Sequence, residues 1–246
     1  MEKRIAPGLV IREQNIGEAD RLITVLTAPY GLVRAFSRGA NTTKSKKLSA
    51  TALLTYSDFT FSRRRDTWSV DDAEAKTVFF GLRDDVAKAA LAQYFCELAG
   101  AFCEEEFESE ETLRLFLNAL SFLESGRRAP AFIKAVTEWR LMCLGGYMPA
   151  LVGCDVCGTY ETDPMFFSYE EGKLYCKDHP APGSGEVGTA VVKAMRHVAL
   201  SDFEKIFAFE LGGESLAQFG KTAEEYLLHK TQKRFKTLDF FKVIGP

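Results

Sequence analysis

The apolar pattern of the chain changes at Gly81, and this change constrains the fold more than any other feature. Before Gly81, short apolar segments alternate with turn residues, and between Tyr56 and Phe61 apolar and polar residues alternate as in a half-buried β-strand. After Gly81, apolar residues recur every three or four positions, which is typical of amphipathic helices. The sequence therefore predicts an α+β protein whose β part comes first.

The first 80 residues predict a small barrel. Five short apolar segments lie in this part of the chain, and Gly, Pro or Asn marks the turns between them. Because so many short strands in so few residues favour a barrel over a sandwich, we expect an OB-type (oligonucleotide-binding) barrel. The expected strands are residues 9–11, 22–26, 32–36, 52–61 and 67–70.

The rest of the chain predicts helices interrupted by a small finger. Pro130 suits the first turn of one of these helices. The expected helices are residues 82–107, 111–123, 130–144, 190–200 and 215–236. The expected domains are the nucleic-acid-binding OB-type barrel at 1–80, a helical domain in two parts at 81–150 and 183–246, and the inserted zinc finger at 151–182.

Two Cys/His pairs form the sharpest motif, with the spacing Cys-x2-Cys-x18-Cys-x2-His. Zinc binds thiolates and imidazoles at tetrahedral corners, and a two-residue spacer lets one tight turn present both side chains. Residues 166–175 read as a β-hairpin turning at Glu171 and Gly172, which returns the second pair beside the first. The motif predicts one Zn²⁺, structural because four protein ligands leave no open position. The predicted ligands are Cys154, Cys157, Cys176 and His179.

The sequence lacks the common catalytic motifs. A nucleobase deaminase also carries Cys-x-x-Cys but needs His-x-Glu, and none of the three histidines stands in that pattern. Phosphate-binding loops, dinucleotide-binding glycines and His-Glu-x-x-His are absent from the sequence as well. Cys96, Cys103 and Cys143 lie in apolar helical surroundings and are expected to be buried thiols. The sequence therefore indicates a protein that is not an enzyme.

The charge is distributed unevenly. The net charge of −3 divides into +4 for residues 1–80 and −7 for the remainder, so the barrel carries the positive excess. OB barrels bind nucleic acid with cations for phosphates and aromatic rings for bases. The candidate DNA-binding cations are Arg34, Arg38, Lys44, Lys46, Lys47, Arg63, Arg64 and Arg65. The candidate stacking rings, of which only some face outward, are Phe36, Tyr56, Phe59 and Phe61.

Two further features bear on location and partners. No apolar run approaches the ~20 residues that cross a bilayer, and the first residues lack the apolar core of a signal peptide, so we expect a cytoplasmic protein. Residues 229–242 hold five Lys/Arg and one acid among apolar side chains. The dipole of a helix C-terminus accounts for most of these cations, and a groove for an acidic peptide with apolar ends is the alternative.

Several stretches together match a family pattern. They are residues 8–13 (GLVIRE), 17–27 (GEADRLITVLT), 39–40 with 44–45, 56–59 (YSDF), 81–85 (GLRDD), 226–229 (YLLH) and 235–240 (FKTLDF). With the quartet between the helical segments, this order resembles bacterial RecO, a family of recombination mediators. Many fingers of that family use four cysteines, and here His179 takes the fourth place.

The resemblance implies a DNA repair protein without turnover or a small-molecule substrate. It implies binding to single- and double-stranded DNA, annealing of complementary strands, and RecA loading in the RecFOR pathway. The implied partners are RecR and the C-terminal tail of single-stranded-DNA-binding protein, in a cytoplasmic, nucleoid-associated setting. Two alternatives stay open from the residues themselves: a zinc-ribbon OB-fold factor that binds RNA, and a scaffold that binds only proteins.

Overall fold

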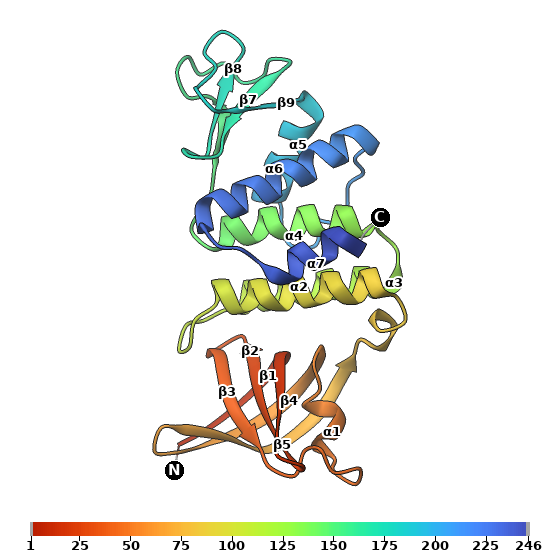
Figure 1. Ribbon diagram of the computed structural model, residues 1–246. Coiled ribbons are helices and arrows are strands. Elements are labelled where there is room, and N and C mark those ends of the chain that lie inside the picture. The colour runs from red at the N-terminus through yellow and green to blue at the C-terminus, as the bar shows by residue number, and fades with distance from the viewer. Residues whose placement is uncertain (1, 245–246) are drawn as a thin grey trace. The chain divides into compact units, whose positions relative to one another are not determined.

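The computed structural model describes residues 2–244 and divides into two compact units (Figure 1). Unit 1 runs to Ser125 and resumes at Phe235, whereas unit 2 is Gly126–Arg234. Unit 1 is therefore assembled from two separate parts of the chain. The sequence predicted four consecutive domains, at 1–80, 81–150, 151–182 and 183–246. That division remains a prediction.

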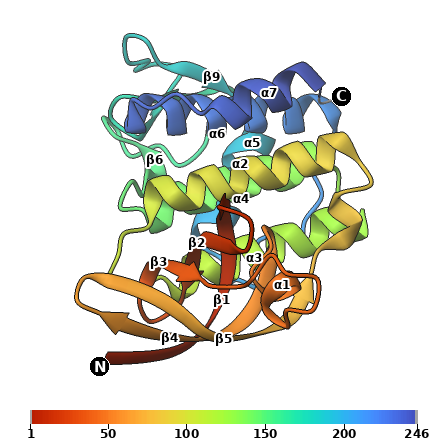
Figure 2. The ribbon, with the colours of Figure 1, turned by 60° about the horizontal axis from the view of Figure 1, so that its bottom comes forward.

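Unit 1 contains a closed five-stranded barrel, as the sequence predicted (Figures 1 and 2). Its order is β1-β2-β3-β5-β4, and β3 pairs with β5 in parallel while the other neighbouring strands pair antiparallel. A short helix, α1 (Lys47–Ala50), follows β3. The strands are β1 (Glu2–Ile16), β2 (Asp20–Thr27), β3 (Gly31–Ser37), β4 (Thr55–Arg64) and β5 (Thr67–Val78).

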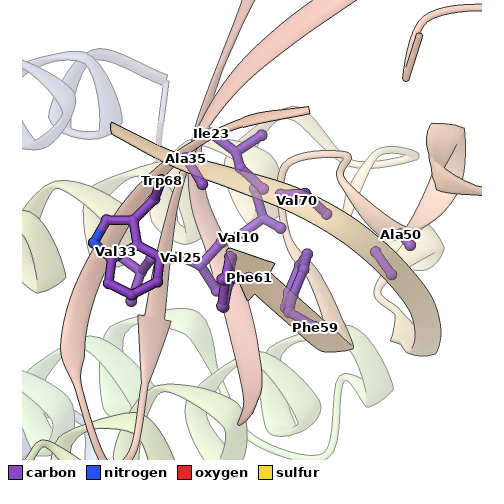
Figure 3. Packing of buried hydrophobic residues seen from close by; sticks show 11 residues of the cluster. Val10, Ile23, Val25, Val33, Ala35, Ala50, Phe59, Phe61, Trp68 and Val70 are labelled. Atoms are coloured by element: carbon purple, nitrogen blue, oxygen red, sulfur yellow. The ribbon is translucent and has the colours of Figure 1, made fainter. Parts of the chain in front are cut away.

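Phe59 and Phe61 lie in the core of this barrel (Figure 3). Their side chains are 1% and 0% exposed, and their rings stack with centroids 5.2 Å apart. Both residues sit on the same face of β4, because side chains two positions apart point to one side of a strand. The prediction that they stack on bases is therefore wrong, because both rings are buried in the barrel core and cannot contact a nucleic acid.

The helices of unit 1 begin and end at identifiable residues. The Asp85 carboxylate accepts the N–H groups of Ala87 and Lys88 at 2.9 and 3.0 Å, so the helix expected from residue 82 begins at Val86. The last helix of the unit packs on α2, where the Tyr94 and Phe235 rings meet edge to face at 5.9 Å. The elements are η1 (Phe80–Leu82), α2 (Val86–Phe102), α3 (Glu110–Ser125) and α7 (Lys236–Ile244).

Unit 2 packs helices around Trp139. The Trp139 ring contacts those of Phe167, Phe219 and Tyr226, and its indole N–H donates to the Met195 carbonyl at 3.0 Å. A small sheet of order β6-β8-β7-β9 carries the finger. The helices are α4 (Pro130–Leu144), α5 (Thr189–Leu200) and α6 (Gly213–Thr231), and the strands are β6 (Ala150–Cys154), β7 (Met165–Ser168), β8 (Lys173–Cys176) and β9 (Gly185–Val187).

The single helix predicted at 215–236 is wrong at its end. α6 stops at Thr231 because Gln232 adopts a left-handed conformation, with φ of 51°. α7 then starts afresh, and the Glu97 carboxylate accepts the Thr237 N–H at 3.0 Å in its first turn. Within residues 2–244, no helix combines the length and apolar character needed to cross a bilayer.

Candidate metal centre and nucleic-acid face

The four predicted ligands converge at one point of unit 2. One ligand atom from each of Cys154, Cys157, Cys176 and His179 lies within 4.8 Å of all the others. The Cys157 and Cys176 Sγ atoms are 3.7 Å apart, close to the ~3.8 Å edge of a tetrahedron with Zn–S bonds of about 2.3 Å. The Cys176 Sγ lies 3.2 Å from His179 Nδ1. The geometry and the donor set therefore fit a four-coordinate soft metal ion.

Glycines shape the turn that presents the first cysteine pair. Gly158 has φ of +72°, and its N–H donates to the Cys154 carbonyl at 2.8 Å. A Cβ on Gly153 would lie 2.8 Å from the Thr159 carbonyl oxygen, so a side chain there would push the turn apart. The two-residue spacer thus closes one tight turn around the metal position.

The predicted β-hairpin returns the second pair. β7 and β8 pair antiparallel. Gly172 closes their turn with φ of +71°, and its N–H donates to the Ser168 carbonyl at 2.8 Å. β8 also lies beside β6 in parallel, with Cys154 opposite Leu174. This pairing brings Cys176 next to the first knuckle, as the sequence predicted.

The peptide groups around the quartet favour thiolate at Cys154. Desolvation raises the pKa of this thiol, but the backbone N–H groups of Cys157, Cys176 and Val156 together lower it to about 6. Desolvation raises the pKa of Cys176, so a bound cation would be needed to hold that group as thiolate. The two cysteines thus differ before metal binds.

The other three thiols behave as buried groups. Burial raises the pKa of Cys96 to about 12, of Cys103 to about 11 and of Cys143 to about 12. Cys96 and Cys103 are buried, and Cys143 is half-buried. The burial predicted for all three is confirmed for Cys96 and Cys103, whereas Cys143 is only half-buried; the raised pKa values suppress thiolate chemistry at all three.

Arg196 on α5 fixes the finger from outside the quartet. Its guanidinium donates to the carbonyls of Leu151, Val152 and Tyr160 at 2.7, 3.2 and 2.7 Å and lies 4.0 Å from the Tyr160 ring centroid. These residues flank the first knuckle on both sides. Because its hydrogen-bond partners are backbone atoms, the local sequence carries no signal for this role, and sequence reasoning missed it.

A cationic face covers the outer side of β1, β2 and β3. On β3, Val33 and Ala35 are buried, whereas Arg34 and Phe36 point outward and Arg38 follows the strand. Phe36 is 36% exposed. One ring is therefore flanked along the chain by two of the predicted cations.

Arg12 extends this face and was missed from the sequence. The β1–β2 register shifts between Val10 and Arg12, which leaves an extra residue in β1 and places Arg12 opposite Thr24. Thr24 in turn pairs with Arg34, and Arg12 and Arg34 line one small pocket of about 90 Å³. A β-bulge has no reliable signature in the local sequence. A strand read as a strict alternation of inward and outward side chains therefore places Arg12 incorrectly. We name the outer face carrying Arg12, Arg34, Phe36 and Arg38 the β3 face.

The other predicted cations lie in two further groups. Lys44 and Lys46 are exposed in the loop before α1, whereas Lys47 is half-buried with its ammonium 3.4 Å from the Val70 carbonyl. Arg64 and Arg65 are exposed at the β4–β5 turn. Arg63 is partly neutralised there, since its guanidinium lies 3.7 Å from Glu2 and 3.8 Å from Asp66.

The outer face of β4 and β5 is acidic. Tyr56 shares this face with Asp58, Asp72 and Glu74, and the main compensating cation is Lys76, which lies 2.8 Å from Asp58. Carboxylates would repel a phosphate backbone that approached Tyr56. Of the four predicted stacking rings, Phe36 alone is both exposed and placed among cations.

Comparison with known proteins agrees with this architecture. Residues 1–79 match the family model "Recombination protein O N terminal", and residues 83–239 match "Recombination protein O C terminal". The DNA repair protein RecO of Acetivibrio thermocellus is 30% identical over 239 residues, which covers 96% of this chain and 95% of the relative. RecO of Caldicellulosiruptor saccharolyticus is 27% identical over 240 residues, covering 97% and 98%. The chain therefore belongs to the RecO family of DNA repair and recombination proteins.

Proposed function

We propose that this protein is a recombination mediator that binds single- and double-stranded DNA through its barrel, anneals complementary strands and acts without catalytic turnover. The observation that carries the proposal is the β3 face, where Arg12, Arg34 and Arg38 lie on the same side of the barrel as the exposed Phe36. Cations bind phosphates of any sequence, and one aromatic ring accepts any base. Such a face suits strand annealing, which needs charge neutralisation and no covalent chemistry.

The spacing along β3 supports contact with an extended strand. Arg34 and Phe36 are two residues apart on β3, about 6.8 Å at ~3.4 Å per residue, and Arg38 follows two residues later in the turn. The three side chains can therefore follow successive units of an extended polynucleotide. The acidic outer face of β4 and β5 limits the bound strand to one side of the barrel.

The partners follow from the family and from α7. We propose that the protein acts with RecR, and with the acidic tail of single-stranded-DNA-binding protein, to load RecA. Lys236, Phe240 and Val243 recur at helical spacing on α7 and are exposed, Phe240 at 52% and Val243 at 83%. A cation beside two apolar side chains suits an acidic peptide that ends in apolar residues.

We also propose that the quartet holds one Zn²⁺ in a structural role. Four protein donors fill a tetrahedral ion, which leaves no position for substrate. The metal would hold the knuckle and the β7–β8 hairpin together. Its contribution to the protein is therefore a folded finger.

Replacing Arg12, Arg34 and Arg38 together by Ala tests the DNA proposal. We expect the variant to bind single-stranded DNA more weakly and the slope of log affinity against log salt to fall by about 2, at ~0.7 per lost phosphate contact. Annealing of complementary strands should slow in parallel. The matched control replaces Lys193, Lys205 and Lys221 of unit 2, which are outside the barrel, and should leave the slope unchanged.

A second variant tests the loop. Replacing Lys44, Lys46 and Lys47 by Ala should lower the slope of log affinity against log salt relative to wild type, because the loop is proposed to contact phosphates. An unchanged slope would show that these residues are not part of the interface. Wild-type protein that bound RNA but did not anneal DNA would favour the RNA-binding alternative. Protein that bound neither nucleic acid would favour the scaffold.

A further inference from the structure

A cleft of about 450 Å³ opens in unit 1 beside the loop that carries Lys44 and Lys46. Phe80 and Arg83 at η1 form one side, and Ser45 and Ser49 form another. The Phe80 side chain is 61% exposed, although a ring of this size is normally buried. The cleft falls within the ~300–1,000 Å³ range of small-ligand sites. It therefore offers an aromatic surface and room for one nucleotide.

A buried charged side chain also lines the cleft and holds the loop beside it. Arg21 lines the cleft and is 7% exposed. Its guanidinium donates to the Leu48 carbonyl and the Thr51 hydroxyl, both at 3.1 Å, and to the Asn41 side-chain oxygen at 3.0 Å. These bonds fix the loop at both ends of its basic segment. The cleft is thus formed before any ligand arrives.

Asp20 adds a second fastening point to the same loop. Its carboxylate accepts the Gly39 N–H at 2.8 Å, and the Asn41 N–H donates to the neighbouring Ala19 carbonyl at 2.9 Å. Ala19, Asp20 and Arg21 come from the GEADR stretch at the β1–β2 turn. That stretch therefore shapes the cleft wall, although its side chains gave no sign of this in the sequence.

The charges around the cleft favour a polyanion. The Arg83 guanidinium lies 5.7 Å from the Phe80 ring centroid, and Lys44 and Lys46 flank Ser45 along the chain. The acid that lines the cleft, Glu13, lies 3.4 Å from Arg21 and accepts the Leu53 N–H at 2.8 Å, so its charge is compensated. Nearby, the Asp85 and Glu124 carboxylates accept backbone N–H groups at the start of α2 and at Gly81, and Asp84 is exposed.

A second groove of unit 1 lacks this combination. Its volume is about 540 Å³, and the described residues that line it include no aromatic ring. They do include Glu97, whose carboxylate caps α7. That groove therefore offers no surface on which a base can stack.

We propose that the Phe80 cleft binds one unpaired nucleobase of single-stranded DNA, with the base against the Phe80 ring and its phosphate beside Arg83. The inference rests on the proposed DNA-binding function and adds the site that distinguishes single strands from duplex. A base in a duplex is stacked on both faces and paired along one edge, so it cannot enter the cleft without being unstacked. The β3 face, by contrast, contacts a backbone that both forms of DNA present.

The test compares Phe80→Ala with Phe80→Trp on single-stranded and duplex DNA of the same length. Loss of one stacking contact should lower single-strand affinity about 5-fold or more while duplex affinity stays the same. Phe80→Trp should retain single-strand affinity because it keeps an aromatic face. Phe107→Ala is the matched control, since Phe107 is 62% exposed in the same unit but does not line the cleft.

The outcomes separate this proposal from the one on which it rests. Equal affinity of Phe80→Ala and wild type for single strands, with a clear loss in the Arg12, Arg34 and Arg38 variant, would overturn the cleft and leave the β3 face in place. An equal loss on both forms of DNA would also overturn it, because the cleft would not discriminate. Wild-type protein that failed to bind DNA would overturn both proposals.

Discussion

Cys154→Ser protein is expected to contain no stoichiometric zinc and to have an unfolded finger. The three remaining donors cannot complete the tetrahedron that Cys154 Sγ closes with the other ligands. Zinc binding supplies about 10–16 kcal/mol of apparent free energy in small zinc-finger peptides, far more than an isolated hairpin of two four-residue strands supplies by itself. Metal analysis of the purified variant should fall from one equivalent to none. Hydrogen exchange should lose its protection across β7 and β8.

Cys143→Ser is the control for this change. Cys143 is a half-buried thiol of α4 outside the quartet, so the variant should keep one equivalent of zinc and a protected hairpin. Chelation of the wild-type protein should reproduce the exchange pattern of Cys154→Ser. A Cys154→Ser protein that still bound one zinc would show that the quartet is not the metal site.

Lys134→Met is expected to lower the free energy of unfolding by about 3–5 kcal/mol, the usual cost of removing one partner from a buried ion pair. The Lys134 ammonium lies 2.9 Å from one Glu138 oxygen and 2.8 Å from Glu224, and the Glu138 side chain is fully buried. Without the ammonium, the Glu138 and Glu224 carboxylates, on α4 and α6, lose the cation that contacts both of them. Urea unfolding of the two proteins measures the difference.

The pH dependence gives this prediction a second readout. Desolvation lowers the pKa of Lys134, but Glu138 and Glu224 outweigh it and raise that pKa above 10.5. The stability that Lys134 supplies is therefore fully present below pH 10.5 and is lost as the pH rises through the folded-state pKa. In Lys134→Met the crowded carboxylates favour a proton, so the deficit should shrink as the pH falls towards the carboxylate range.

Two further variants decide what the loss means. Lys205→Met removes an exposed ammonium that pairs with Asp202 at 2.9 Å, and we expect no measurable change in unfolding. Adding Glu138→Leu to Lys134→Met should recover much of the stability, because it removes the fully buried carboxylate that has lost its cation. A double variant no more stable than Lys134→Met would show that packing, and not stranded charge, causes the loss.

Local signals carried the parts of the fold that were predicted well. The helix at Pro130–Leu144 has the predicted bounds, because proline suits its first turn and its apolar residues follow one period. The metal quartet and its hairpin were equally accessible, since two-residue spacers and Gly172 act within a few residues. Each of these features depends on atoms that are close in the chain.

The features that were missed depend on distant atoms. Phe59 and Phe61 have the same alternation as a solvent-facing stripe, and only closure of the barrel decides which face is inside. The chain leaves α6 at Gln232, and the next helix is capped by Glu97, which lies far away in the sequence. Arg12 joins the β3 face through a bulge that shifts the register.

The helix α7 is synthesised last but belongs to the unit that is synthesised first. The ribosome releases the barrel, α2 and α3 first, then all of unit 2, and only afterwards the helix that packs on α2 and completes unit 1. In the finished protein, α7 and the Phe235 ring pack on one surface of α2. Until α7 has been synthesised, this surface of the nascent chain stays uncovered. Unit 1 is thus begun first and finished last, so a chain that stalls anywhere in unit 2 carries a barrel unit with an open apolar side.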